Sequence, residues 1–255
     1  MEILYFLVTL FATVIGAIAG IGGGIIIKPA LDAVGTYNIA TIAVLSSITV
    51  LCMATVSAGK HIKSGIKLDL KIIILSLGAV LGGFAGKFLF DIFSGVLNDS
   101  LAKGIQAVML ILLLIFSLLR KHYPQYNIQN KLIIFIAGLL MGMISSFLGI
   151  GGGPINIVII IMAFSVDTRD AAVYSIFVIF FSQLANVINT VITPGLGQFD
   201  LRMLLFMIPA AVIGGLAGSY LNRRLSKKVV EHLFNGLMGM VILLNIYNIY
   251  VFFIR

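Results

Sequence analysis

The five-residue phrase Gly-Ile-Gly-Gly-Gly occurs twice in the chain, at residues 20–24 and again at 149–153. Three consecutive glycines release the backbone from helical geometry, and a short apolar segment follows each phrase, at 25–34 and 154–164. A helix that starts behind bare glycine amides presents free N–H groups and the positive end of its dipole, which together can bind an anion. Carbonyl groups of unwound backbone can equally bind a cation, so the phrase alone does not fix the sign of the ligand.

Polar side chains within the apolar stretches are the second feature that could do chemistry, because each is costly to bury in lipid. Gln183, Asn186 and Asn189 are spaced by three residues and therefore share one helix face. Asn156 lies three residues past the second glycine phrase, where we expect a substrate contact, and Ser175 is a further candidate. For single Ser and Thr residues, hydrogen bonds between helices, worth about 0.6 kcal/mol each, are the simpler explanation.

Lys28 follows the first phrase by four residues. Three interpretations stay open: it pairs with an anionic substrate, it pairs with Asp32 one helical turn later, or it extends to the lipid headgroups. The residues that we expect to bind substrate are Gly22, Gly23, Gly24, Gly151, Gly152, Gly153, Asn156, Ser175, Gln183 and Lys28.

No arrangement of residues suggests catalysis, so we expect no enzymatic activity, no metal site and no cofactor. The histidines, which lie in or near basic loops or at a helix start, are His61, His122 and His232. The carboxylates at the ends of apolar stretches, none of which is expected to relay protons, are Asp91, Asp99, Asp167, Asp170 and Asp200. Cys52 is the only cysteine, which excludes an internal disulfide. No Gly-Lys-Ser/Thr follows either glycine phrase, so a nucleotide P-loop is excluded as well.

Composition identifies the class of protein: 60% of the 255 residues are hydrophobic and only 10% are charged, whereas soluble domains carry about 25% charge. Continuous apolar stretches occupy residues 3–20, 39–58, 72–90, 101–119, 132–148, 171–193, 203–221 and 233–254. Several reach the ~17–25 residues that a helix needs to cross a bilayer. We therefore predict an all-α polytopic membrane protein with about eight long helices and two short glycine-broken helices, which are either re-entrant or half-helices.

Basic residues cluster in three loops, which together hold eleven of the seventeen lysines and arginines. They are Lys60, Lys63, Lys67 and Lys71; Arg120, Lys121 and Lys131; and Arg223, Arg224, Lys227 and Lys228. This pattern is typical of cytoplasmic loops, so the net charge of +8 indicates orientation in the membrane and not nucleic-acid binding. With all three loops on one side, the segments around the second glycine phrase must either cross twice or enter and return on the same side. The short run after the glycines fits the second alternative better.

The chain contains an internal repeat. The alignment that superposes Gly20 on Gly149, which we call the repeat alignment, also places Ser46 on Ser175. Further along, after a small difference in loop length, the small-residue motifs at 82–86 and 214–218 superpose, and such motifs favour helix packing. Equivalent loops have opposite charge bias, so we expect two inverted repeats, the architecture of many secondary transporters. Repeat 1 is expected at residues 1–120, a basic cytoplasmic linker at 121–130 and repeat 2 at 131–255.

The chain resembles the TauE/SafE family, the sulfite exporter-like permeases with two homologous halves. The matching residues are Gly20 to Gly24 with Pro29-Ala-Leu31, and Gly149 to Asn156 followed by Ala171 to Ser175. Val158 stands where many second copies carry proline, a role that Pro154 can take over. The resemblance implies transport of small sulfur-containing anions across the bacterial cytoplasmic membrane.

We therefore expect a secondary carrier for a small anion such as sulfite, thiosulfate or an organosulfonate, working by alternating access at a midplane site within the lipid bilayer of the cell membrane. The alternative is a passive channel for a small anion or solute, with the glycine phrases as a fixed filter. A non-transporting subunit or an intramembrane enzyme is a weaker alternative. The sequence leaves open whether the chain acts alone or as a homo-oligomer, and which ion drives transport.

Overall fold

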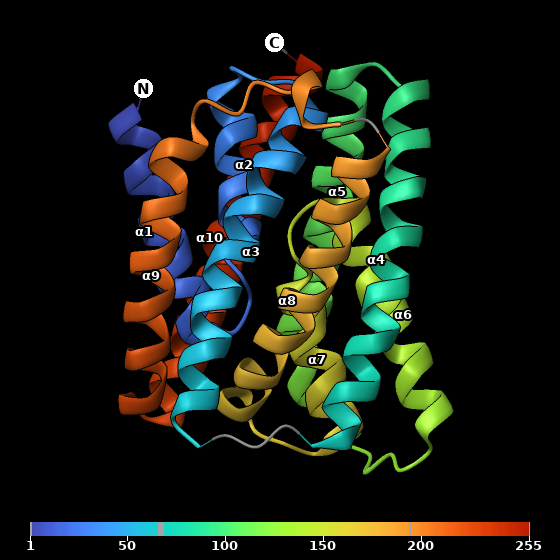
Figure 1. Cartoon of the computed structure of the whole chain (residues 1–255), viewed down its shortest axis with the longest axis vertical. Coiled ribbons are helices and arrows are strands. Elements are labelled where there is room, and N and C mark those ends of the chain that lie inside the picture. Colours follow the sequence, from blue (N-terminus) through green and yellow to red (C-terminus); the bar gives the residue numbers. More distant parts are fainter. Residues whose placement is uncertain (1, 66–68, 194, 255) are drawn as a thin grey trace.

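The computed structural model describes residues 2–65, 69–193 and 195–254, and within these ranges it is helical and contains no strand. The α-helices are α1 (Glu2–Ala19), α2 (Gly24–Val34), α3 (Ile39–Lys63), α4 (Leu70–Val96), α5 (Asp99–Leu118), α6 (Lys131–Leu148), α7 (Gly153–Phe164), α8 (Thr168–Ile192), α9 (Leu204–Arg224) and α10 (Lys227–Ile254). Two 3₁₀ turns, η1 (Leu119–His122) and η2 (Leu196–Gln198), complete the described elements. Eight of the helices are long and apolar enough to cross a membrane, which confirms the predicted fold class (Figure 1).

Local capping fixes where several of these helices begin. The side chains of Asn38, Asn98, Asn130 and Asp167 accept hydrogen bonds from backbone amides in the first turns of α3, α5, α6 and α8. Such caps satisfy N–H groups that a helix start leaves unpaired. The two helices that follow the glycine phrases differ, because neither α2 nor α7 has a side-chain cap. Their first amides are left to backbone contacts or to a ligand.

Helices α1 and α2 form a hairpin whose two open ends lie on the same side of the molecule. The ring of Tyr5, near the start of α1, packs edge-on against Tyr37, just past α2, with 6.3 Å between ring centroids. Helices α6 and α7 form a second hairpin, because the amides of Tyr126 and Ile128, before α6, donate to the carbonyls of Met162 and Ala163 at the end of α7. The two hairpins enter from opposite ends (Figure 1). The glycine-flanked segments therefore enter and return on the same side.

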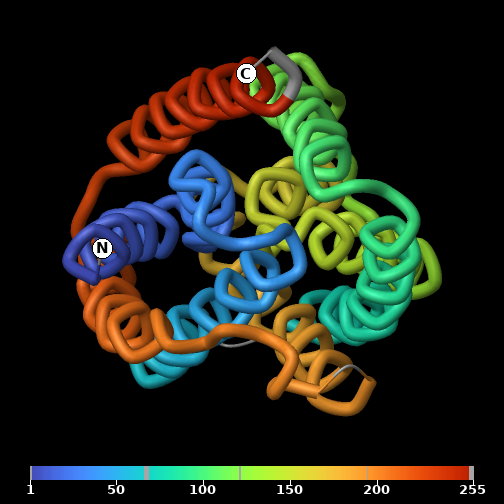
Figure 2. Tube along the Cα trace, turned by 90° about the horizontal axis from the view of Figure 1, so that it is seen from above, coloured from blue at the N-terminus to red at the C-terminus, as the bar shows by residue number. Residues whose placement is uncertain are grey.

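A twofold relation links the helices α1–α5 to α6–α10. Helix α4 packs along α6 as α9 packs along α1, and α3 packs on α9 as α8 packs on α4. Each pair becomes the other when the halves are exchanged, as expected for inverted repeats. Viewed from above, the short helices α2 and α7 lie inside a ring formed by the longer ones (Figure 2). The residues that follow both glycine phrases are accordingly buried.

Glycines form the seams between the long helices. A Cβ atom added at Gly82 or Gly86 of α4 would lie 2.0 or 2.1 Å from a carbonyl oxygen of α6. At Gly214 of α9, a Cβ would lie 2.0 Å from the hydroxyl oxygen of Thr13 in α1, and at Gly218 2.4 Å from the carbonyl oxygen of Val14. The predicted packing role of both small-residue motifs is confirmed. Close backbone approach of this kind is a main source of helix association in lipid.

The basic loops gather at one end of the molecule, the lower end in Figure 1. Arg223 donates a hydrogen bond to the hydroxyl of Ser64, and the Lys71 Nζ lies 3.2 Å from the side-chain oxygen of Asn127. Lys67, which belongs to the first basic cluster, lies outside the described residues. The predicted placement of the three loops on one side agrees with these contacts.

An ion pair joins two segments at this end. The Lys227 Nζ lies 2.5 Å from a carboxylate oxygen of Asp167. Partial burial acts to raise the pKa of Asp167, but hydrogen bonds from Lys227 and from the amides of Asp170 and Arg169, with the Lys227 charge, hold that pKa below its ordinary value. The start of α10 is therefore fastened to the start of α8.

The glycine seam between α4 and α6 gives a direct test of packing. We expect Gly82→Ala to lower the free energy of unfolding by about 1–3 kcal/mol, because the added methyl group must push α6 away. Gly95→Ala, in the same helix, is the control, since a Cβ there meets no atom within 4 Å. Thermal unfolding in detergent measures both variants. Equal midpoints for the two would contradict the close packing of this seam.

Candidate functional site

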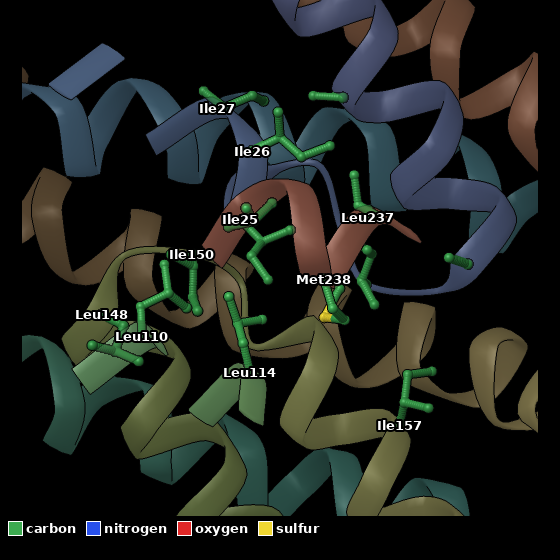
Figure 3. Packing of buried hydrophobic residues seen from close by; sticks show 14 of the residues in the cluster. Ile25, Ile26, Ile27, Leu110, Leu114, Leu148, Ile150, Ile157, Leu237 and Met238 are labelled. Atoms are coloured by element: carbon green, nitrogen blue, oxygen red, sulfur yellow. The ribbon is translucent and has the colours of Figure 1, made fainter. Parts of the chain in front are cut away.

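The two glycine phrases meet in the centre of the molecule and run antiparallel to each other. A Cβ atom added at Gly24 would lie 2.4 Å from the carbonyl oxygen of Ile150, and one added at Gly153 would lie 1.8 Å from the carbonyl oxygen of Ile21. Figure 3 shows Ile25, the first residue after one phrase, beside Ile150 of the other. No side chain larger than hydrogen fits at either glycine. The repeat alignment relates the two contacts, so the twofold axis passes between the phrases.

Helices α2 and α7 begin where the phrases cross and run toward opposite ends of the molecule (Figure 1). Their N-termini therefore face each other. Gly22 and Gly151 have positive φ angles of 65° and 76°, which turn the chain into each short helix at a conformation that few other residues adopt. The two dipoles each place about half an elementary positive charge at this crossing. A small anion is the ligand that such a pair of helix starts attracts.

Apolar side chains close the crossing on one flank. Gly22 and Gly151 both lie against Val50 of α3 and Ile179 of α8, whose carbons come within 3.8 Å of a Cβ position at each glycine. Val50 and Ile179 are themselves equivalent under the repeat alignment. They form a matched apolar pair on the axis, which excludes water from the crossing and strengthens any electrostatic interaction there.

Polar side chains with unpaired atoms surround the crossing. The Asn156 side-chain oxygen lies 3.2 Å from a Cβ position at Gly152, the Gln183 amide carbon 3.9 Å from that at Gly151, and the Ser46 hydroxyl 3.0 Å from that at Gly24. Asn156 and Gln183 are both 0% exposed. Among the described residues, their side-chain amides and the hydroxyls of Ser46 and Ser175 have no hydrogen-bond partner. A buried polar group without a partner costs about 1–3 kcal/mol, so these groups suit a polar ligand that satisfies them.

The predicted substrate-binding glycines, Asn156 and Gln183 therefore lie together. Ser175 is buried in α8, and the twofold relation gives it the place of Ser46 in α3. The two halves do not contribute the same polar side chains to the crossing. At the positions of repeat 1 that are equivalent to Asn156 and Gln183, the chain has Ile27 and Ala54. The second half supplies most of the polar side chains, and the first half supplies mainly backbone.

Lys28 is buried, with 3% of its surface exposed, so its extension to the headgroups is wrong. Its Nζ lies 3.4 Å from a carboxylate oxygen of Asp32, which confirms the ion pair, and its Cε lies 3.6 Å from a Cβ position at Gly149 of the other glycine phrase. Asp32 is thus a buried carboxylate, and it is absent from the carboxylates that the sequence places at the ends of apolar stretches. It stays buried because the lysine one turn away neutralises it.

The sequence reasoning missed Lys87, which is buried in α4 and pairs with Asp91. Lys87 lines a small hollow between the crossing and the end remote from the basic loops. The other residues that line it are Ala43, Val44, Ser47, Phe90, Ser146, Asn186 and Thr190. The Asn186 amide donates to the Ser47 hydroxyl at 3.0 Å. A lone cation inside the apolar stretch 72–90 is the signal that could have found Lys87.

His61 is a second residue whose place the sequence does not give. The sequence predicts it at a basic loop, but in the structure it lies buried in the last turn of α3. His122 and His232 are exposed. Among the described residues, no group of three or more His, Cys, Asp or Glu side chains could hold a metal ion.

Known proteins resemble this chain in sequence over most of its length. The family model described as "Sulfite exporter TauE/SafE" matches residues 5–245. The "Probable membrane transporter protein YunE" of Bacillus subtilis is 23% identical over 248 residues, which cover 87% of this chain and 88% of that protein. The "Probable membrane transporter protein MJ0441" of Methanocaldococcus jannaschii is 27% identical over 242 residues, which cover 89% of each chain. No solved structure matches.

The buried pair of Lys28 and Asp32 leads to a stability prediction. We expect Lys28→Met alone to lower the free energy of unfolding by about 3–5 kcal/mol, because it leaves the Asp32 carboxylate buried without a cation. The double variant Lys28→Met with Asp32→Leu should regain most of that stability, since no charge remains buried. Thermal unfolding in detergent distinguishes them, and a single variant as stable as the wild type would contradict the pairing.

Proposed function

Because the chain belongs to the sulfite exporter TauE/SafE family, we propose that this membrane transporter is a secondary carrier for a small sulfur-containing anion such as sulfite, thiosulfate or an organosulfonate. The observation that carries the proposal is the crossing of the two glycine phrases, where two uncapped helix N-termini face each other beside unpaired amides. The chain is a multi-pass membrane protein. Its proposed location is the bacterial cytoplasmic membrane, with the basic loops in the cytoplasm.

The site binds an anion through donors that are already in position. The free amides at the starts of α2 and α7 and the side-chain amides of Asn156 and Gln183 are N–H donors, and the hydroxyls of Ser46 and Ser175 add O–H donors. Oxyanions of sulfur present several acceptor oxygens on one small centre, so they can accept from several directions at once. Lys28 lies beside the second phrase and contributes a positive charge that Asp32 partly offsets.

Two equivalent routes lead from the crossing to opposite ends. The outer route contains the hollow lined by Lys87, Asn186 and Thr190. At the equivalent inner positions, the Ser57 hydroxyl of α3 donates to the Gly215 carbonyl of α9, and the Ser219 hydroxyl donates to the same carbonyl from within α9. The outer side thus holds a hollow of about 10 Å³, which is room for about one water, whereas the inner positions are packed. An exchange of these two packings is the alternating access expected of inverted repeats.

The closed crossing favours a carrier over a channel. Backbone contacts between Gly24 and Ile150, and between Gly153 and Ile21, leave no passage between the phrases. A channel needs a route that stays open to both sides at once, whereas a carrier opens to one side at a time.

Counterflow tests the proposal directly. In proteoliposomes, we expect saturable uptake of radiosulfur-labelled sulfite, thiosulfate or a small sulfonate that accelerates when the same anion is preloaded inside. Acceleration follows because a loaded site returns faster than an empty one. Conductance far above carrier turnover would indicate the channel instead. Flat uptake of all three anions by folded protein would overturn the link to sulfur anions.

Gln183 gives a test of the site. We expect Gln183→Leu to reduce uptake by about tenfold or more, because each lost hydrogen bond to a charged ligand is worth about 1.5–3 kcal/mol. Leucine has a similar volume, so the protein should elute as the wild type does on size exclusion. The matched control is Asn189→Leu in the same helix, since Asn189 bonds to the exposed Thr193 side chain. Equal uptake by the two variants would remove Gln183 from the site.

A further inference from the structure

His61 is a buried imidazole that lacks a partner. It is 0% exposed in the last turn of α3, and neither of its ring nitrogens has a hydrogen-bond partner among the described residues. The chain's other histidines, His122 and His232, are exposed. A buried ring with two unpaired nitrogens costs free energy, and a ligand that pairs with them would offset that cost.

The surroundings of His61 are cationic. Arg223 of α9 donates to the hydroxyl of Ser64, one turn past His61, and the Lys60 Nζ lies 3.0 Å from the Leu216 carbonyl oxygen. Within the described part of the chain, no ion pair joins either cation to a carboxylate. The region around the ring therefore attracts anions.

The other elements packed against this part of α3 add one cation and one carboxylate. Arg169, at the start of α8, donates to the Arg223 carbonyl, and Asp170 follows it in the same turn. Helix α1 contributes a backbone carbonyl, that of Ile18, which accepts from the Asn222 amide. The charged side chains named on these segments are thus three cations, Lys60, Arg223 and Arg169, and one carboxylate, Asp170.

His61 is also equivalent to a residue that lines the outer hollow. Under the repeat alignment it is equivalent to Thr190, and Ser57 one turn earlier is equivalent to Asn186. Both Thr190 and Asn186 line the outer hollow. In a state with the two packings exchanged, His61 would line the inner hollow as Thr190 lines the outer one here.

We propose that His61, Arg223 and Lys60 form a second anion subsite at the inner end of the route, which takes a small oxyanion such as thiosulfate or an organosulfonate. This inference rests on the proposed function. The ring binds one proton and becomes an imidazolium whose N–H groups donate to the anion. Because proton and anion each favour the binding of the other, the inner affinity for the anion rises as the inner pH falls.

The test uses right-side-out and inside-out vesicles with radiosulfur-labelled thiosulfate and a small sulfonate, whose charges stay constant through this pH range, unlike that of sulfite. At the face with the basic loops, we expect the wild-type KM to rise by about tenfold between about pH 6 and about pH 8. His61→Gln should have a KM that varies less than about twofold over this range and matches the wild-type value at high pH. The KM at the opposite face should stay the same in both proteins.

His122→Gln and His232→Gln are the matched controls and should keep the wild-type pH dependence. If His61→Gln elutes as an aggregate, Arg223→Gln provides the second measurement. It should raise the inner KM by about threefold or more at both pH values, while Arg202→Gln, at the opposite end, should not. Wild-type pH dependence in His61→Gln, or an unchanged inner KM in Arg223→Gln, would overturn the subsite alone. Absence of any wild-type flux would instead overturn the proposed function, and the subsite with it.

Discussion

The backbone contact between the two glycine phrases is the constraint on which the rest of the structure depends. Gly24 lies against the Ile150 carbonyl and Gly153 against the Ile21 carbonyl, so each unwound segment packs directly on the other. Irregular backbone at this depth in a membrane is stable only where protein covers it. The ring of long helices in Figure 2 provides that cover, and the glycine seams between α4 and α6 and between α1 and α9 allow the ring to close tightly.

The sequence predicts the fold well because its main signals are local. The apolar stretches that predict the eight long helices need only length and composition, and Gly-Ile-Gly-Gly-Gly marks both breaks without knowledge of their neighbours. The repeat alignment also relates contacts that the structure shows, since Gly22 and Gly151 meet the same equivalent pair, Val50 and Ile179. Charge parity leaves two topologies open around the second phrase, and the length of the short run favours the return of α7 to its own side, which the structure shows.

Depth within the bundle is harder to predict, because it depends on which helices pack together. In the sequence, the pairing of Lys28 with Asp32 is one of three interpretations of this lysine. Both residues are buried because α2 lies inside the ring of long helices. His61 stands next to Lys60 in a basic segment, yet its ring is buried while Lys60 reaches a carbonyl of α9. Sequence reasoning misses Lys87 for the same reason. In each case the residue type is visible, whereas its burial depends on how helices of both halves pack together.

The unequal chemistry of the two halves follows from what an inverted repeat must and must not share. Backbone geometry at the crossing is reciprocal, because exchange between two equivalent packings requires it. Side chains need no such symmetry, and here Asn156 and Gln183 face Ile27 and Ala54 at the equivalent positions. Two further equivalent pairs also differ in chemistry: Lys87 is equivalent to Ser219, and His61 is equivalent to Thr190. A carrier whose halves exchange shape but not chemistry offers an anion different partners on its two sides, and that difference can give direction to transport between equivalent routes.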